Sequence, residues 1–179
     1  AEGLQALDRA GVLHRDLKPE NLFAHFGPEG IRIVLTDFGV GIARAGDGAS
    51  RLTRSGMFVG TASYLPPEVG QGGELDIRAD IYGLGVMLFV MATGKVPFHG
   101  SFRRSLEAKR KDAPPRLVEL GFPAALSDVV ESAMASNRDH RFATPVAPAE
   151  ALVQVQRILG LKTGDDAFDE VPLHPEPND

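Results

Sequence analysis

Three side chains near the start of the chain combine a proton acceptor, a cation and a neutral oxygen donor within six residues. They are Asp16, Lys18 and Asn21, in the string H-R-D-L-K-P-E-N at 14–21. Phosphoryl transfer needs in-line positioning, a group that takes the hydroxyl proton, and cations against the phosphate charge. Asp16 would accept the proton, Lys18 would stabilise the transferring phosphate, and Asn21 would hold one Mg²⁺.

A second metal ligand is expected from the string D-F-G at 37–39, which follows a branched run at 31–35 that reads as a strand. In this motif the aspartate, here Asp37, binds the metal that bridges the phosphates. Carboxylate and amide oxygens suit Mg²⁺, and Mn²⁺ could take its place. A lone D-F-G string is usually a turn that arises by chance. This one follows the eight-residue string at 14–21 in the right order and at the right spacing.

Five ordered motifs resemble the C-terminal lobe of a eukaryotic-type Ser/Thr protein kinase, of the kind also found in bacteria. Besides the two strings above, they are G-T-A-S-Y-L-P-P-E at 60–68, D-I-Y-G-L-G at 80–85 and G-K-V-P-F at 94–98. The resemblance covers residues 1–160. It implies a mainly α (α+β) fold, a helical bundle with short β-hairpins at the catalytic cleft. Residues 161–179, acidic and Pro-containing, read as a linker or a disordered tail.

The resemblance also implies where ATP would lie. The backbone of Glu20 would meet the ribose, Phe23 would lie under the adenine, and Thr36 would lie near it. Thr61 would bridge the catalytic carboxylate and ammonium through its hydroxyl. The lysine two positions after the catalytic aspartate is the pattern of Ser/Thr kinases.

Other matched positions would have structural roles. His14 and Phe38 would stack in a hydrophobic spine that Asp80 anchors. Glu68 and Arg141, the family's late arginine, would form a buried ion pair that ties the activation segment to the distal helices. The plainer alternative for this pair is two solvated charges.

The resemblance also implies regulation by phosphorylation of the activation loop, because Arg15 directly precedes the expected catalytic aspartate. A phosphate brings a charge of about −2 and three acceptor oxygens, which an arginine can clamp. The candidate acceptors are Thr53 and Ser55, upstream of the 60–68 motif. The alternative is that both are ordinary polar loop residues.

Hydrophobic periodicity predicts the elements that must position these motifs. The strongest is a helix over 77–93, apolar nearly all round and therefore buried on all sides, with Gly94 as its stop. Met87 and Met91 on this helix would support the adenine stack. We expect further helices over 2–10, 101–110, 124–136 and 147–159, a loop with short strands over 12–24, a turn at 27–30 and a long loop over 39–60.

Composition excludes several classes of protein. The chain has no cysteine, so disulfides and cysteine metal sites are ruled out. Its net charge of −5 argues against nucleic acid or an anionic membrane as the main partner. The longest apolar run, 81–92, is shorter than the ~20 residues that cross a bilayer. We expect a cytoplasmic location, with any membrane anchor outside this segment.

The sequence contains no Gly-rich loop and no V-A-I-K lysine, the parts that cover and align the ATP phosphates in protein kinases. The N-terminal lobe would therefore belong to a longer parent, which would phosphorylate Ser/Thr residues of protein substrates. Two alternatives stay open for this chain: a non-catalytic kinase-like binding module, or an inactive truncated fragment. A small-molecule kinase is disfavoured by the 60–68 motif. The face left by the absent lobe predicts low solubility or self-association.

Overall fold

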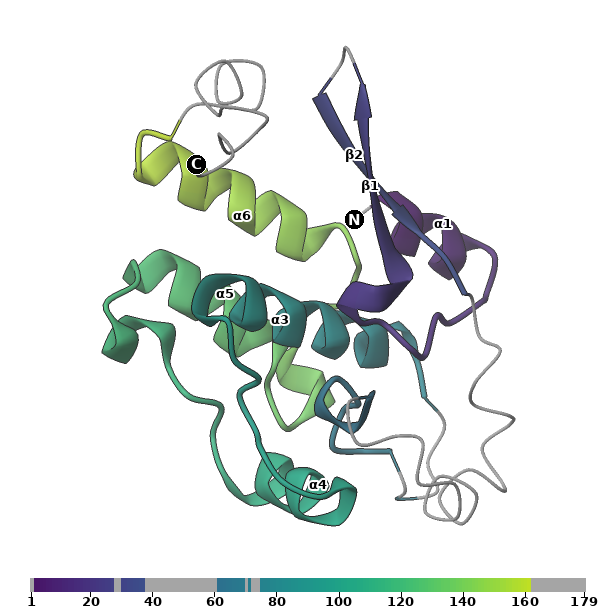
Figure 1. The fold of residues 1–179 in the computed structure, drawn as a ribbon, viewed down its shortest axis with the longest axis vertical. Helices are drawn as coiled ribbons and strands as arrows, with labels where there is room; N and C mark the ends of the chain where they lie inside the picture. Colours follow the sequence, from purple (N-terminus) through teal and green to yellow (C-terminus); the bar gives the residue numbers. More distant parts are fainter. Residues whose placement is uncertain (1, 28–29, 38–60, 70, 72–74, 162–179) are drawn as a thin grey trace, which may run out of the picture.

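The computed structural model describes residues 2–27, 30–37, 61–69, 71 and 75–161 of the 179-residue chain. Helices dominate and pack around one central helix, beside a two-stranded hairpin (Figure 1). The predicted long loop and C-terminal tail lie outside the described residues. In chain order the elements are α1 (Glu2–Arg9), β1 (Leu22–Gly27), β2 (Gly30–Leu35), α3 (Ile77–Thr93), α4 (Phe102–Lys111), α5 (Ala124–Ala133) and α6 (Ala147–Ile158).

The central helix α3 begins and ends where the sequence predicts. Asp76 caps its start by accepting the backbone N–H of Arg78 at 2.9 Å. Gly94 ends it at φ 70°, a left-handed conformation that glycine adopts without strain. More than half of the helix is buried, including Met87. The expected burial on all sides is wrong in the last turn, because Met91 is 79% exposed.

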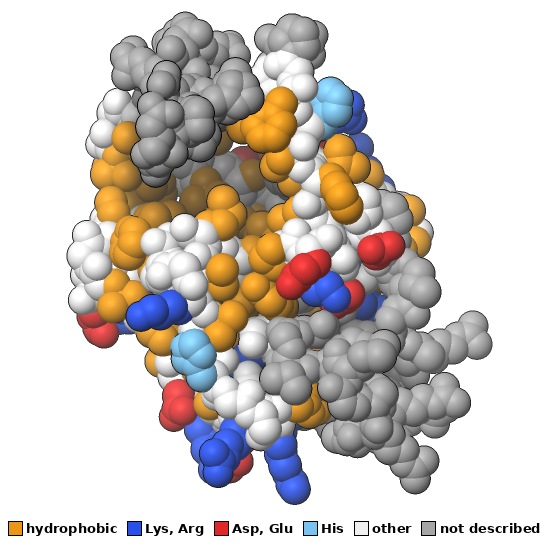
Figure 2. Space-filling view, viewed as in Figure 1, with side chains coloured by type: hydrophobic (Ala, Val, Ile, Leu, Met, Phe, Trp, Pro, Cys, Tyr) orange, Lys and Arg blue, Asp and Glu red, His pale blue; other side chains and the backbone are white. Residues whose placement is uncertain are grey.

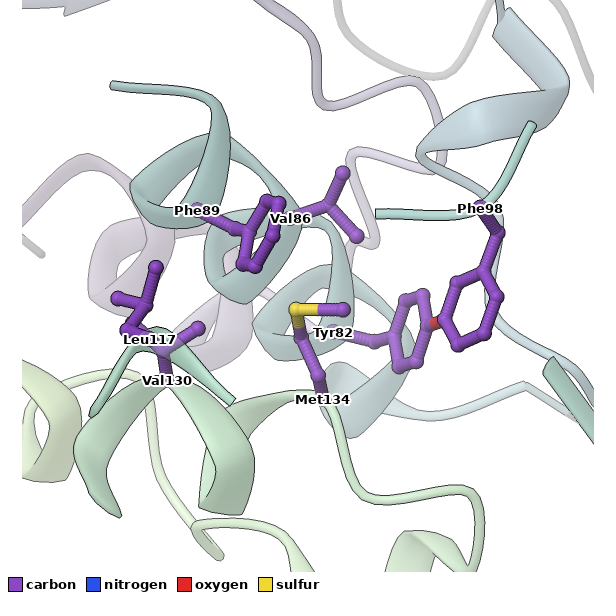
Figure 3. Packing of buried hydrophobic residues seen from close by; sticks show 7 residues of the cluster. All are labelled: Tyr82, Val86, Phe89, Phe98, Leu117, Val130 and Met134. Carbon is purple, nitrogen blue, oxygen red and sulfur yellow. The ribbon is translucent and has the colours of Figure 1, made fainter. Parts of the chain in front are cut away.

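The main core lies between α3 and α5. Its buried residues are Tyr82, Val86, Phe89, Phe98, Leu117, Val130 and Met134 (Figure 3). The two helices touch at Gly85, where an added Cβ would lie 2.8 Å from both Ala133 Cβ and Met134 Cγ. A hydrogen atom at this position lets the helix backbones approach closely. The close packing at Gly85 therefore fixes the position of α3 against α5.

A second, smaller cluster joins the hairpin to the helices. The strands pair antiparallel from Leu22 opposite Leu35 to Gly27 opposite Gly30. At the base of the hairpin, Leu22 and Leu35 pack against the buried residues Leu4, Leu17 and Met87. Strand β1 runs three residues past the end of the predicted loop at 24, because its whole length pairs with β2. The far ends of the two strands point away from the helices (Figure 1).

The end of helix α5 could not be predicted from the local sequence. Helix α5 ends at Ala133, three residues before the predicted end. The next carbonyls are taken by a distant side chain: Arg141 Nε donates to Ala135 O at 2.7 Å, and Arg141 Nη2 donates to Ser136 O at 3.3 Å. Helices α4 and α6 agree with the predicted spans to within about one residue. No helix in the described part of the chain is long and apolar enough to cross a membrane.

Candidate active site

The buried carboxylate of Asp80, in the first turn of α3, holds the backbone of the loop that carries Asp16. Asp80 Oδ2 accepts the N–H of His14 at 2.7 Å, and Oδ1 accepts the N–H of Arg15 at 2.8 Å. Burial raises the pKa of Asp80, and these two hydrogen bonds oppose that rise. Arg15 has φ 64°, a left-handed conformation that is costly for a residue other than glycine. The carboxylate therefore holds a strained turn directly before Asp16.

The three residues with catalytic chemistry meet at one carboxylate. Lys18 Nζ donates to Asp16 Oδ2 at 2.7 Å, and the Asn21 amide nitrogen donates to Asp16 O at 2.8 Å and to Oδ2 at 3.2 Å. Asp16 Oδ1 is buried, and it has no hydrogen-bond partner among the described residues. One carboxylate oxygen is thus held by a cation and an amide, while the other is left to accept a further hydrogen bond.

The hairpin brings Asp37 to the same place. Thr36 N donates to Asn21 O at 3.0 Å, which continues the strand pairing by one residue, and His14 Nε2 donates to Thr36 O at 3.0 Å. Asp37 comes next, with φ 58° and an exposed side chain. Two strained non-glycine residues, Arg15 and Asp37, therefore flank the site, which is where such strain tends to occur.

These groups fit a hard divalent cation. The Asn21 nitrogen is used on Asp16, so the amide oxygen is the atom left for a metal, and the exposed carboxylate of Asp37 adds a second oxygen. The described residues contain no group of three His, Cys, Asp or Glu that could hold a metal by themselves. Such a sparse protein ligand set suits Mg²⁺, which keeps waters and shares substrate phosphate oxygens.

A pocket opens beside Asp16. Its lining combines residues 15–17 of the loop, residues 64–66, 69 and 75, and residues 79, 80 and 83 of α3. Burial raises the pKa of Tyr64, which lines it, and the negative charge of Glu20 adds to the rise. The pocket thus lies where the loop that carries Asp16 meets the segment before Glu68.

The predicted ion pair between Glu68 and Arg141 is present. Arg141 Nη1 donates to Glu68 Oε1 at 2.7 Å and Nη2 donates to Oε2 at 2.8 Å, a two-point contact. The arginine side chain is 0% exposed and the glutamate side chain 18%. The guanidinium also lies over the Tyr82 ring, 4.9 Å from its centre. This pair joins the segment after 61–63 to the turn that follows α5.

Comparison with known proteins agrees with these motifs and this geometry. Residues 1–151 match the family model described as the protein kinase domain. The chain belongs to the protein kinase family. Among its relatives, serine/threonine-protein kinase PknL of Mycobacterium tuberculosis is 36% identical over 162 residues, 89% of this chain and 39% of that protein. A probable serine/threonine-protein kinase PknB of Bifidobacterium longum is 38% identical over 148 residues, 79% of this chain and 21% of that protein.

Solved structures show the same fold. The crystal structure of the Mycobacterium tuberculosis PknI kinase domain matches with a TM-score of 0.59 and 26% sequence identity. The match covers 84% of this chain and 50% of that chain. This kinase chain therefore spans half the length of the solved domain, and less than half of the curated relatives that it matches.

Several residues predicted for the kinase site can be located, and others cannot. His14 is fully buried, whereas Glu20 is exposed and Phe23 on β1 is 60% exposed. Residues Phe38, Thr53 and Ser55 lie outside the described part of the chain, as does the side chain of Thr61. The expected stacking, bridging and phosphorylation roles of these four residues stay predictions.

Sequence reasoning missed Lys109 on α4. Its side chain is 0% exposed, and its Nζ donates to three carbonyl groups within 62–65. One signal could have found it: Phe102, Leu106 and Lys109 fall at helical spacing on one face, so this lysine occupies a position usual for an apolar residue. A lysine on the buried face of a short helix requires partners in the fold.

Proposed function

We propose that the protein carrying this chain transfers the γ-phosphate of ATP to Ser and Thr hydroxyls of other proteins. The observation that carries the proposal is the arrangement at Asp16, where Lys18 and Asn21 hold Oδ2 and leave Oδ1 without a hydrogen-bond partner among the described residues, in a residue that lines the pocket. This is the arrangement that a proton acceptor for a substrate hydroxyl requires. The printed names of the relatives, serine/threonine-protein kinases, support the same reaction.

Each residue of the loop has a distinct task in this mechanism. Asp16 accepts the hydroxyl proton as the substrate oxygen attacks, and the Lys18 ammonium, 2.7 Å away, keeps the carboxylate in place and faces the transferring phosphate. Asn21 and Asp37 would hold Mg²⁺, or Mn²⁺ in its place. Bound Mg²⁺ and ATP supply the neutralising charge and the phosphoryl group.

The nucleotide would be held by residues on the same hairpin. Glu20 would meet the ribose through its backbone, Phe23 would lie under the adenine, and Thr36 would lie beside it. The exposed ring of Phe23 on β1 supports this assignment, because an aromatic face open to solvent can stack on a base. Thr61 would complete the site by bridging Asp16 and Lys18.

The test is phosphorylation of a generic basic protein by the full-length protein, with and without Mg²⁺. Asp16→Asn should lower the rate by roughly 10²–10⁴-fold, because it removes the proton acceptor. Asp128→Asn is the matched control, since this carboxylate is 70% exposed on α5. Equal activity of wild type and Asp16→Asn would dismiss the catalytic assignment.

A second function is favoured for the 179-residue chain taken alone. It spans half the length of the solved PknI kinase domain, so by itself it is better suited to act as a non-catalytic kinase-like module that binds partners. Residues 1–160 would form this C-terminal lobe and 161–179 its tail. Mg²⁺-dependent phosphorylation by the isolated chain, lost in Asp16→Asn, would contradict this second assignment.

Regulation by phosphorylation is a further part of the proposal. Arg15 is held directly before Asp16 by the contact of its N–H with Asp80, so a phosphate bound by its guanidinium would act on the catalytic loop itself. The acceptors would be Thr53 and Ser55. Mass spectrometry of the active full-length enzyme should find phosphate on one of them, and its absence from both would contradict the assignment.

A further inference from the structure

Lys109 is a fully buried cation whose partners in the described part of the chain are carbonyl groups and no carboxylate. Its Nζ donates to Ala62 O, Ser63 O and Leu65 O, each at 2.8 Å. An ammonium has three N–H donors, so all of them are used on one short stretch of backbone. Burying a charge in this way is costly unless every donor is satisfied. The contact therefore needs an explanation beyond simple packing.

The next residue of α4 continues the same pattern. Arg110 Nε donates to Pro67 O at 2.9 Å, and its Nη2 donates to Val69 O at 3.2 Å. Two consecutive side chains, called the carbonyl clamp below, thus hold five carbonyl groups between residues 62 and 69. Hydrogen bonds from charged donors are stronger than neutral ones, so this stretch is fixed mainly from α4.

The clamped stretch lines the pocket beside the catalytic carboxylate. Residues 64–66 and 69 line the same small pocket as Asp16. A protein segment that brings its hydroxyl to Asp16 would therefore pass next to the clamped backbone. The position of this backbone would then influence how closely a protein substrate approaches.

We propose that Lys109, assisted by Arg110, is a positioning residue for the protein substrate, because it fixes the backbone of residues 62–66 against which that substrate lies. The inference rests on the proposed kinase function. Among the described residues, the hydrogen bonds of Lys109 and Arg110 reach neither Asp37 nor the hairpin that would carry ATP, so the clamp should act on the protein substrate and leave the nucleotide unaffected. A displacement of about 1 Å in a positioning element can lower a rate 100-fold.

The test compares three variants of the full-length protein in steady-state kinetics. Lys109→Met removes the charge and keeps the apolar stem, and Lys109→Arg keeps the charge. Lys111→Met is the matched control, since Lys111 lies on the same helix, is 70% exposed, and pairs only with Glu107 at 2.7 Å among the described residues. The measurements are KM for a generic basic protein, KM for ATP, and ATP hydrolysis without a protein substrate.

Lys109→Met should raise KM for the protein substrate by roughly 10–100-fold, leave KM for ATP and the hydrolysis rate unchanged, and be partly rescued by Lys109→Arg. Lys111→Met should match wild type. An unchanged KM for the protein substrate, or an equal fall in phosphoryl transfer and in ATP hydrolysis, would overturn the proposal. If Lys109→Met fails to fold, Arg110→Met takes its place, with a smaller rise expected and an unchanged KM again counting against the proposal.

Amide hydrogen exchange separates this inference from the proposed function. In the wild-type chain, the amides of residues 62–65, 68 and 69 should exchange more slowly than in Lys109→Met or Arg110→Met, and Lys111→Met should again match wild type. If wild type transfers no phosphate to any protein, the proposed function fails, while exchange still decides whether Lys109 and Arg110 hold this stretch of backbone. Equal exchange rates for these amides in all variants would show that Lys109 and Arg110 do not hold this stretch of backbone.

Discussion

Two buried cations approach the ring of one tyrosine, and they are satisfied in different ways. Arg141 lies 4.9 Å and Lys109 lies 5.6 Å from the centre of the Tyr82 ring. Arg141 faces the carboxylate of Glu68, whereas Lys109 faces carbonyl groups. Burial lowers the pKa of Lys109 to about 7. Burying the protonated side chain of Lys109 therefore lowers the free energy of unfolding, and the size of this loss should depend on pH.

The free energy of unfolding should therefore depend on pH through Lys109. The folded protein releases this proton near pH 7, whereas an unfolded lysine releases it near 10.5. Between these values the unfolded chain binds up to one more proton, so stability rises with pH by up to about 1.4 kcal/mol per unit. Burial raises the pKa of the facing Tyr82, so this tyrosine does not titrate in the same window.

Denaturant unfolding of wild type and Lys109→Met at pH 6.5, 8 and 9.5 measures the effect. The stability of wild type relative to the variant should be constant below pH 7 and should increase above it. A difference that stays flat from pH 6.5 to 9.5 would show that Lys109 keeps an ordinary pKa in the folded protein.

The arginine pair gives a second prediction at this scale. Arg141→Ala strands the partly buried carboxylate of Glu68 and leaves the carbonyls of Ala135 and Ser136 without this donor. We expect a loss of ~3–5 kcal/mol in the free energy of unfolding. Arg138→Ala, in the exposed turn three residues earlier, should cost no more than ~1 kcal/mol. An unchanged melting temperature for Arg141→Ala would rule out a structural role for the pair.

At the scale of elements, α3 joins the site to the core. Its first turn supplies Asp80 to the catalytic loop, and its middle contacts α5 through Gly85. A shift of α3 against α5 would therefore move the carboxylate that holds His14 and Arg15. The packing of these two helices and the shape of the loop are linked through one element.

Gly85→Ala tests this linkage. The added Cβ would lie 2.8 Å from Ala133 Cβ, a distance at which one helix must move. Overpacking costs ~1–3 kcal/mol, which should outweigh the gain of about 1 kcal/mol in helix propensity. Gly27→Ala is the control, because its Cβ would meet only the His25 side chain at 3.7 Å. Thermal unfolding in which Gly85→Ala is as stable as wild type would contradict the close contact.

Elements with local signals could be predicted from the sequence. The long apolar run of α3 predicted a helix, and the aspartate and glycine on either side of it mark its two ends, so both ends were predicted correctly. The end of α5 was not, because residues 134–136 contain no glycine or proline that marks the end of a helix. Lys109 was missed because its acceptors lie 44 to 47 residues earlier in the chain. The types and spacing of Asp16, Lys18 and Asn21 predicted one shared site, and their side chains do meet, whereas their catalytic roles stay a prediction.

At the scale of the whole molecule, the hairpin presents an apolar face beyond the core. Residues directly opposite in the strands share a face, so Phe26 and Ile31 extend the side on which Leu22 and Leu35 are packed. Phe26 is 69% exposed and Ile33 56%. Figure 2 shows apolar side chains at the surface of this projecting part of the molecule. Such a patch usually marks a contact surface.

The isolated 179-residue chain should therefore self-associate as its concentration rises. Phe26→Ser combined with Ile33→Ser should shift the equilibrium towards monomer, because both changes fall on the apolar face of the hairpin. Val153→Ser, on the exposed side of α6, is the control. Sedimentation velocity over a range of concentrations measures the change. A monomer at all concentrations, or equal association of the variants, would contradict the role of this face.

The hydrogen bonds between Asp80 and the backbone of His14 and Arg15 also limit the order in which the chain can fold during synthesis. They join residues 66 and 65 positions apart, and the contact of Glu68 with Arg141 spans 73. During synthesis the loop emerges first, yet it can take its strained shape only after α3 has formed, and the clamped stretch must wait for α4. Contacts of such sequence separation form slowly. Synthesis therefore passes α3 before the loop that carries Asp16 can take the shape described above.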